Sequence, residues 1–347
     1  MIDTADSGTS MSAERKTADS VPVAQARATK FPRSTLIHIV GRPGLLGVLV
    51  LLSILAALIS PTFLQLSNLI NVLRQMALYG IVSIGMTFVI LTAGIDLSVG
   101  STVAIVAVVV TQILNGAPLP PWVALGIGVI LGAMVGAING LGITRGRIPA
   151  FIMTLGTMVM GRGLAMTLAN GEPISLSDSA VATIGWIGNG FLLYVPVPVW
   201  IFVAIALLAS LTLRSAAYGR YVYALGGNKE ACRLSGIPIL VVETSVYVIS
   251  GVLAALTAIV FVARLTVAEP TAGTGLELEA IATTVMGGAS LFGGKGNIPG
   301  TILGAAILAV LANVLNLAGV TPFTQQIVKG AIIISAVLVD RLKEKQK

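Results

Sequence analysis

Ten apolar runs, separated by short polar segments, constrain this chain more than any other feature of its sequence. A helix of about 20 apolar residues is long enough to cross the hydrocarbon core of a membrane. Hydrophobic residues make up 56% of the 347 residues, and the mean hydropathy of +0.97 lies outside the range of soluble domains. We therefore predict an all-α polytopic membrane protein with about ten transmembrane helices. The runs occupy residues 44–60, 69–92, 102–114, 122–143, 149–169, 197–213, 239–263, 276–290, 300–317 and 323–339.

The cations predict how the spans are oriented. Lys and Arg residues near membrane spans favour the cytoplasmic side. If both termini are cytoplasmic and 276–290 crosses as a short helix, then Arg145, Arg147, Lys295, the cations of 214–233 and the C-terminal lysines all lie inside. The loop 170–196 has no Lys or Arg and is predicted to lie outside. We expect a multi-pass protein of the cytoplasmic (inner) membrane.

The polar ends of the chain predict three regions. Residues 1–40 are polar, without apolar periodicity, and predict a disordered or interfacial cytoplasmic segment. Residues 41–341 form the predicted transmembrane domain, and 342–347 a cytoplasmic tail.

The inventory of reactive residues excludes several classes of protein. Cys232 is the only cysteine and His38 the only histidine, which argues against disulfides, Cys-based or His-based metal sites and most hydrolase chemistry. The net charge of +7 comes from short loops and tails, so it does not indicate nucleic-acid binding. We expect no enzyme activity, metal or cofactor in this chain.

The polar loop 214–238 interrupts the later apolar runs with Arg214, Arg220, Lys229, Glu230 and Arg233. Residues 228–236 predict a short helix: Asn228 is a suitable N-cap, Glu230 lies in the first turn, and Gly236 ends the helix. Two interpretations are open. The helix is either an interfacial connection between spans or a docking element that takes force from a soluble partner.

This loop resembles the EAA-x3-G coupling motif of ABC-importer permeases. The match is Glu230-Ala231-Cys232, three residues and then Gly236, with Cys232 in place of the second alanine. Further blocks are similar to the ribose/xylose/galactose-type sugar permeases and occur in order between about residues 69 and 304, so the resemblance extends over most of the membrane domain. These blocks are 91–101, 148–157, 218–228, 234–238 and 287–301.

The resemblance implies a non-catalytic permease subunit of an ATP-driven importer that moves a monosaccharide, a ribose-like pentose or a hexose, inward. It also implies a homodimer or a heterodimer with a similar permease, a cytoplasmic ABC ATPase that binds the ATP, a periplasmic or lipid-anchored sugar-binding protein, and surrounding membrane lipid. The coupling residues would be Asn228, Lys229, Glu230, Ala231, Arg233 and Gly236.

Other functions remain open at this stage. The block around Asp96 is shared more loosely with branched-chain amino-acid and nucleoside permeases. An ion-coupled secondary transporter is an alternative of another class. The glycine-rich segment 288–296 does not match a phosphate-binding loop, because Ala289 and Gly296 stand where a glycine and a serine or threonine are needed.

Polar residues inside the apolar runs are candidates for the transport pathway. Asp96 and Ser98, in the sequence AGIDLSVGS, could cap the third helix or serve sugar binding and gating, and Glu277 has the same alternatives. Arg162 lies about 18 Å along its span and is expected to face the protein interior. The amides of Asn139 and Asn313 suit sugar hydroxyls, but they equally suit contacts between helices.

Glycine recurs at every fourth position in the span 122–143, at Gly128, Gly132, Gly136 and Gly140. That spacing predicts close packing against another helix. A weak internal repeat also relates 94–97 to 275–278 and 128–133 to 300–305, which suggests a duplicated transporter core.

Overall fold

The structure is a computed structural model that describes residues 43–116 and 119–345. The segment 1–40, predicted to be disordered or interfacial, lies outside the described residues. The predicted tail begins inside the last helix, which continues to Lys345.

The described part of the chain is almost entirely helical. Two short antiparallel strand pairs, β1 with β4 and β2 with β3, are its only sheet. The elements in chain order are α1 (Pro43–Ile59), α2 (Leu66–Leu91), α3 (Val99–Gly116), α4 (Pro121–Thr144), α5 (Ala150–Leu168), β1 (Ile174–Ser175), α6 (Asp178–Asn189), β2 (Phe191–Leu192), β3 (Val195–Pro196), α7 (Val197–Ser215), α8 (Ala217–Gly227), α9 (Lys229–Leu234), α10 (Ile239–Leu265), β4 (Val267–Ala268), α11 (Leu276–Met286), α12 (Ile298–Leu317) and α13 (Pro322–Lys345).

Every apolar run of the sequence is a helix, and the prediction of an all-α polytopic membrane protein is confirmed. Within the described residues, seven helices are long and apolar enough to cross a membrane: α2, α3, α4, α5, α7, α10 and α12. The helix α1 has 17 residues and α11 has 11. The total of ten crossings therefore stays a prediction.

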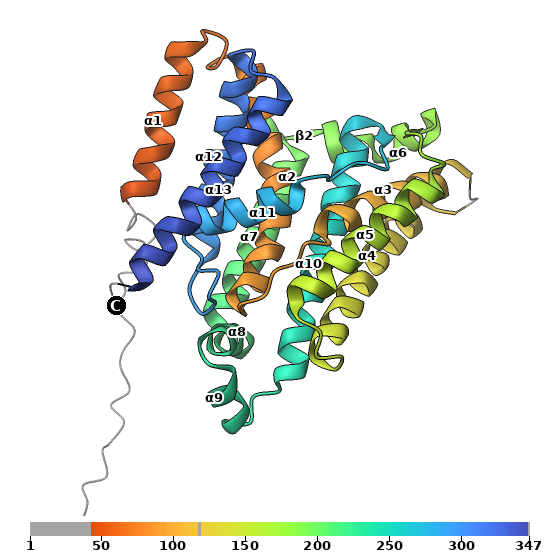
Figure 1. Ribbon diagram of the computed structural model, residues 1–347. Coiled ribbons are helices and arrows are strands. Elements are labelled where there is room, and N and C mark those ends of the chain that lie inside the picture. The colour runs from red at the N-terminus through yellow and green to blue at the C-terminus, as the bar shows by residue number, and fades with distance from the viewer. Residues whose placement is uncertain (1–42, 117–118, 346–347) are drawn as a thin grey trace, which may run out of the picture. The chain divides into compact units, whose positions relative to one another are not determined.

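Two layers of helices can be distinguished in the membrane domain. The inner helices α2, α3, α10 and α12 are mostly buried, whereas α4, α5 and α7 turn most of their surface outward. Figure 1 shows α10 and α2 at the centre, α3, α4 and α5 on one side, and α1 and α12 on the other. Large apolar side chains such as Ile130, Val159 and Leu208 cover the outer surface, as expected for a surface in contact with lipid.

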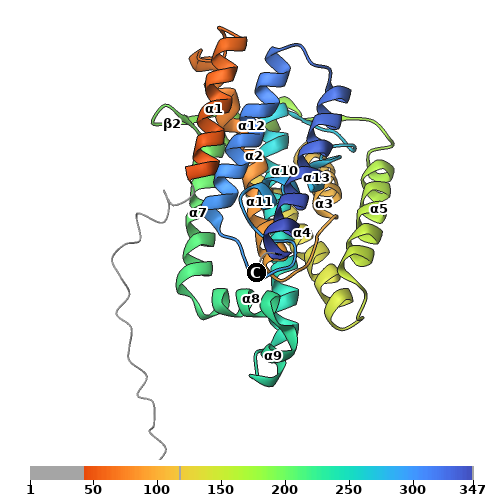
Figure 2. The ribbon, with the colours of Figure 1, turned by 60° about the vertical axis from the view of Figure 1, so that its left-hand side comes forward.

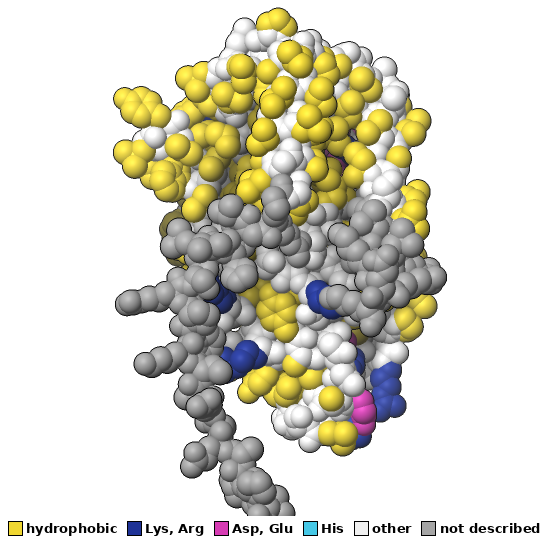
Figure 3. Space-filling model, turned by 90° about the vertical axis from the view of Figure 1, so that its left-hand side faces the viewer, with side chains coloured by type: hydrophobic (Ala, Val, Ile, Leu, Met, Phe, Trp, Pro, Cys, Tyr) yellow, Lys and Arg dark blue, Asp and Glu magenta, His cyan; other side chains and the backbone are white. Residues whose placement is uncertain are grey.

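The two ends of the helix bundle differ in character. The helices α8 and α9 lie together at one end, and α6 with β2 lies at the opposite end (Figures 1 and 2). On the face drawn in Figure 3, apolar side chains dominate the upper part, whereas the visible Lys, Arg and Glu side chains gather in the lower part, toward α8 and α9. This polarity agrees with a bundle that spans a membrane.

The predicted outer loop 170–196 contains a helix that the sequence analysis missed. The hydroxyl of Ser177 accepts a hydrogen bond from Ala180 N and so caps α6. The helix buries Ala180, Ile184 and Gly188, which lie four residues apart on one face. The spacing of these small and apolar residues is the signal that could have identified it.

The four glycines of α4 that recur at every fourth position all lie against neighbouring helices. A Cβ atom added to Gly132, Gly136 or Gly140 would lie 2.2–2.7 Å from backbone atoms of α10. At Gly128 it would instead meet the side chain of Val110 on α3 at 2.6 Å. Only glycine leaves room for the two backbones to approach this closely. Close packing stabilises the helix pair, because the hydrophobic effect does not drive helices together in lipid.

Replacing Gly136 by Ala should lower the stability of the protein, because the new methyl group would meet the carbonyl oxygen of Tyr247 at 2.2 Å. Overpacking of this kind costs about 1–3 kcal/mol. The matched control is Gly126→Ala on the same helix, where the methyl group would meet nothing within 4 Å. Thermal unfolding in detergent compares the two, and equal melting temperatures would contradict the close α4–α10 contact.

Candidate functional site

The helix α9 forms where the sequence predicts it, with both predicted caps. The side chain of Asn228 accepts a hydrogen bond from Ala231 N at 2.9 Å and satisfies the first turn. At the other end Gly236 has a φ of +74°, and the N–H groups of Gly236 and Ile237 donate to the carbonyls of Arg233 and Cys232. A non-glycine residue in this left-handed conformation would cost about 1–2 kcal/mol.

Lys229, one of the predicted coupling residues, forms an ion pair with a residue of a long apolar helix. Lys229 Nζ donates to both oxygens of Glu243 on α10, at 2.6 and 2.9 Å. Glu243 is almost buried, and the ion pair compensates its charge. Lys229 therefore anchors α9 to the start of α10, a role that the sequence could not reveal because Glu243 lies 14 residues away.

The remaining surface of α9 is open. Glu230 and Arg233 form an exposed ion pair on successive turns, with contacts of 2.5–3.1 Å, and Arg233 lowers the pKa of the Glu230 carboxyl. Ala231 is exposed beside them. Leu234 is 75% exposed at the tip, a residue that the sequence analysis did not select. An apolar tip ringed by charged groups can fit a groove in another protein.

The helix α8, which the sequence analysis missed, directly precedes α9 and packs against it. It buries Gly219, Val222 and Leu225 at a spacing of three, a helical signal inside the polar loop. The Tyr218 hydroxyl is hydrogen-bonded to Ser245 on α10 at 2.7 Å. Burial raises the pKa values of the Tyr218 and Tyr223 hydroxyls, so both stay neutral donors.

The other side of α8 touches two interruptions of the membrane helices. Tyr223 donates its hydroxyl proton to the carbonyl of Gly296 at 2.8 Å. A Cβ atom on Gly226 would lie 1.9 Å from Leu91 O and 2.5 Å from Gly294 N, and these two groups are hydrogen-bonded to each other. The end of α2, the loop 287–297 and α8 therefore meet backbone to backbone.

The interruption between α2 and α3 begins with a left-handed residue. Ala93 has a φ of +61°, and the N–H groups of Ala93 and Gly94 donate to Ile90 O and Val89 O, which closes the last turn of α2. The hydroxyl of Thr92 donates to Val89 O as well. These bonds satisfy backbone groups that lipid would leave without partners.

Asp96 holds the start of α3 in place. Its Oδ1 accepts from the N–H and the hydroxyl of Ser98, at 3.0 and 2.6 Å, and its Oδ2 accepts from the Ser250 hydroxyl on α10 at 2.7 Å. The carboxylate is 1% exposed. Asp96 accepts from three donors and so has the geometry that a helix cap requires. These hydrogen bonds involve both of its carboxylate oxygens.

The network extends into two further helices. Asn139 on α4 donates to the Ser98 hydroxyl at 2.8 Å, and Thr157 on α5 donates to the Asn139 oxygen at 2.6 Å. Three of the predicted pathway residues, Asp96, Ser98 and Asn139, thus belong to one buried network. Thr157 and Ser250 were missed because nothing in their local sequence shows that they face it.

The other three pathway candidates lie elsewhere. Arg162 donates to the carbonyls of Pro270 and Ala272, at 3.2 and 2.7 Å, and so faces the protein as predicted. Glu277 lies near Arg162, accepts from Gly275 N, and buries its Oε2 against Gly100 without a protein partner. Asn313 exchanges two amide hydrogen bonds with Asn68 and joins α12 to α2.

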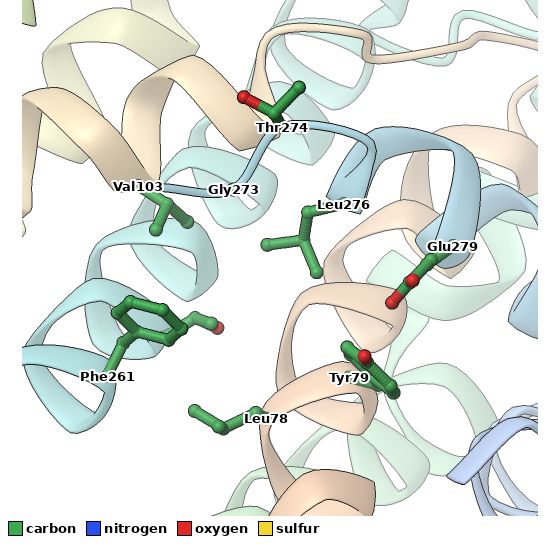
Figure 4. A pocket seen from close by; sticks show the side chains of 9 residues that line it. Leu78, Tyr79, Val103, Phe261, Gly273, Thr274, Leu276 and Glu279 are labelled. Atoms are coloured by element: carbon green, nitrogen blue, oxygen red, sulfur yellow. The ribbon is translucent and has the colours of Figure 1, made fainter. Parts of the chain in front are cut away.

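A cavity of about 170 Å³ lies beside the start of α11. Figure 4 shows the Glu279 carboxylate and the Tyr79 ring together on one wall, with Phe261 on the opposite wall. The sequence analysis selected none of these three residues, although it selected Glu277, two positions before Glu279.

Comparison with known proteins identifies the family. The profile of the family described as "Branched-chain amino acid transport system / permease component" matches residues 68–337. The chain belongs to this permease family. The match includes the interrupted helices, α8 and α9, so the candidate sites lie within the shared part of the permease.

Several curated relatives are similar over most of their length. The ribose import permease protein RbsC of Escherichia coli (strain K12) is 48% identical over 301 residues, which are 86% of this chain and 93% of the relative. RbsC of Bacillus subtilis (strain 168) is 43% identical over 86% and 92%. The L-arabinose transport system permease protein AraH of E. coli (strain K12) is 35% identical over 88% and 92%. No solved structure matches the chain.

Replacing Asp96 by Ala should destabilise the permease, because it leaves the buried donors of Ser98 and Ser250 without an acceptor. Each buried donor left unpaired costs about 1–3 kcal/mol. Asp178→Ala, at an exposed position on α6, is the matched control. Thermal unfolding in detergent measures both, and a melting temperature for Asp96→Ala equal to that of the control would show that the carboxylate does not hold α3.

Proposed function

We propose that this chain is the permease subunit of an ATP-driven ABC importer that moves a monosaccharide, a ribose-like pentose or a hexose, inward across the cytoplasmic membrane. The observation that carries the proposal is α9, a capped helix with an open tip, packed against α8 in a chain similar to ribose and L-arabinose permeases. Both termini and α9 lie in the cytoplasm.

The partners follow from what the chain offers. The exposed Glu230, Arg233 and Leu234 dock into a cytoplasmic ABC ATPase, which binds and hydrolyses the ATP, so the permease itself is not an enzyme. A periplasmic or lipid-anchored sugar-binding protein delivers the substrate. Two permease chains, identical or similar, form the channel together within the lipid.

The contacts of α8 supply the mechanical step. When the ATPase subunits close, α9 moves. The start of α10 moves with it, because Lys229 is paired with Glu243 and Tyr218 is hydrogen-bonded to Ser245 there. Through Gly226 and Tyr223 the same motion reaches the end of α2 and the loop 287–297. These segments lead to Asp96 and to α11. The pathway thus changes its opening in response to ATP that the partner subunit binds.

A second substrate class is favoured by one observation, the family description, which names branched-chain amino acids. The names of the similar relatives favour sugars. Uptake of labelled ribose, arabinose and leucine into proteoliposomes that contain the complete importer decides between them. ATP-independent, ionophore-sensitive uptake by the chain alone would contradict the importer proposal altogether.

Replacing Glu230 or Leu234 by Ala should reduce ATP-driven sugar uptake by about tenfold or more, because interface hot spots cost about 2 kcal/mol when truncated. A pull-down of the tagged permease from its membranes should recover less ATPase. The matched controls are Glu172→Ala and Leu193→Ala, exposed residues at the opposite end of the bundle. Full recovery of the ATPase with both α9 variants would contradict the docking role.

Two adjacent glycines test the mechanical step. Gly226→Ala would place a methyl group 1.9 Å from Leu91 O, whereas Gly227→Ala meets nothing within 4 Å. We expect Gly226→Ala to lower the number of sugars moved per ATP hydrolysed and Gly227→Ala to leave it unchanged. Tyr223→Phe, which removes only the hydrogen bond to Gly296, should lower the ratio less. An unchanged ratio in both Gly226→Ala and Tyr223→Phe would contradict this route.

A further inference from the structure

The cavity beside α11 has two walls of different chemistry. It lies between α2, α3, α10 and the segment that leads into α11 (Figure 4). Its volume of about 170 Å³ is far more than the ~15 Å³ that a single water needs. Four lining residues carry polar groups and the others are apolar or glycine: Tyr79, Thr257, Thr274 and Glu279, against Leu78, Val103, Phe261, Gly273 and Leu276.

The polar wall is arranged to bind hydroxyl groups. Gln75 donates its amide proton to the Tyr79 oxygen at 3.0 Å, and the Tyr79 hydroxyl is hydrogen-bonded to the Glu279 carboxylate, so Tyr79 holds that carboxylate in place. Glu279 turns its carboxylate toward the same side of the cavity, as Figure 4 shows. A carboxylate has about four lone-pair sites, so Glu279 can still accept hydrogen bonds from the hydroxyl groups of a polyol.

The charge of Glu279 is compensated from outside the cavity. Its Oε1 accepts from Lys329 Nζ on α13, and Lys329 does not line the cavity. The lining residues include no Lys or Arg that could pair with a substrate carboxylate. An amino acid would therefore leave its carboxylate unpaired there, whereas a neutral sugar carries no charge to compensate.

The opposite wall provides an apolar surface. Phe261 stands across the cavity from Tyr79 and Glu279, and Leu78 and Leu276 lie between them (Figure 4). A flat ring can cover the C–H face of a sugar while its hydroxyls point to the polar wall. The cavity also borders the start of α11, where Gly273 and Gly275 have φ values of +72° and +82°. Interrupted helices are where many transporters place their substrate.

We propose that this cavity is a monosaccharide-binding subsite within one permease subunit, with Glu279, positioned by Tyr79, accepting from the sugar hydroxyls and Phe261 covering an apolar face. This inference rests on the proposed function and names the part of the pathway that contacts the sugar. Asp96, whose oxygens are filled by serines, is outside it.

The test uses the complete importer, with its ATPase and binding protein, in proteoliposomes. Glu279→Gln, Tyr79→Phe and Phe261→Ala are compared with the matched controls Glu172→Gln, Tyr194→Phe and Phe323→Ala, which alter the same residue types at exposed positions. Initial uptake of labelled ribose and of 2-deoxyribose is measured together with ATP hydrolysis, and thermal unfolding in detergent verifies that each variant is folded.

We expect the cavity variants to lower ribose uptake at least tenfold per ATP hydrolysed, with the controls at the wild-type level. We also expect Glu279→Gln or Tyr79→Phe to change the ratio of ribose to 2-deoxyribose uptake, because a site that binds hydroxyls distinguishes a sugar that lacks one. A purely structural role would not alter that ratio.

Two other results separate the ways in which the inference fails. If folded cavity variants transport both sugars as the controls do, the proposed subsite is contradicted, whereas the proposal of a sugar importer is not affected. If the wild-type importer takes up leucine and no sugar, the proposed function itself is wrong and the subsite falls with it.

Discussion

The structure depends on one constraint: inside a membrane every backbone N–H and C=O group must find its partner within the protein. Long helices meet this demand by themselves, but the chain interrupts them at 92–98 and 287–297. At both interruptions the protein supplies the missing partners, through the turn at Ala93, the carboxylate of Asp96 and the bond from Gly294 N to Leu91 O. The hydrogen bonds of Asp96 at the first interruption are therefore of the structural kind.

This constraint also explains where the glycines lie. Backbone that leaves a helix inside the bundle must approach other backbone closely, and a side chain would prevent it. Gly100 lies against Gly273, Gly226 against Leu91 and Gly294, and Gly287 against Gly300. Such contacts leave little room for independent movement. The proposed coupling route depends on these contacts, because a displacement at α8 would be passed to the interrupted segments rather than absorbed.

The sequence predicts local features well and distant pairings poorly. The apolar runs predicted every membrane helix, and the α9 helix with its caps followed from Asn228 and Gly236, because these signals lie within a few residues of each other. Ser250 is 154 residues from Asp96, and Lys329 is 50 from Glu279, so neither partner could be inferred. The helices α6 and α8 were missed because their buried residues are small and few.

The two acidic residues of the internal repeat show why a shared pattern does not imply a shared role. Asp96 and Glu277 both precede or begin an interrupted helix, yet Asp96 has three donors whereas Glu277 keeps one buried oxygen without a protein partner. Glu277 also lies against Gly100, the second residue of α3, so the second repeat position packs against the helix whose start Asp96 holds. The start of α3, fixed by Asp96, is thus the support on which the segment 273–277 rests. That segment forms the rim of the cavity that Glu279 lines. The hydrogen bonds of Asp96 in the first repeat therefore help to fix the position of this rim in the second repeat.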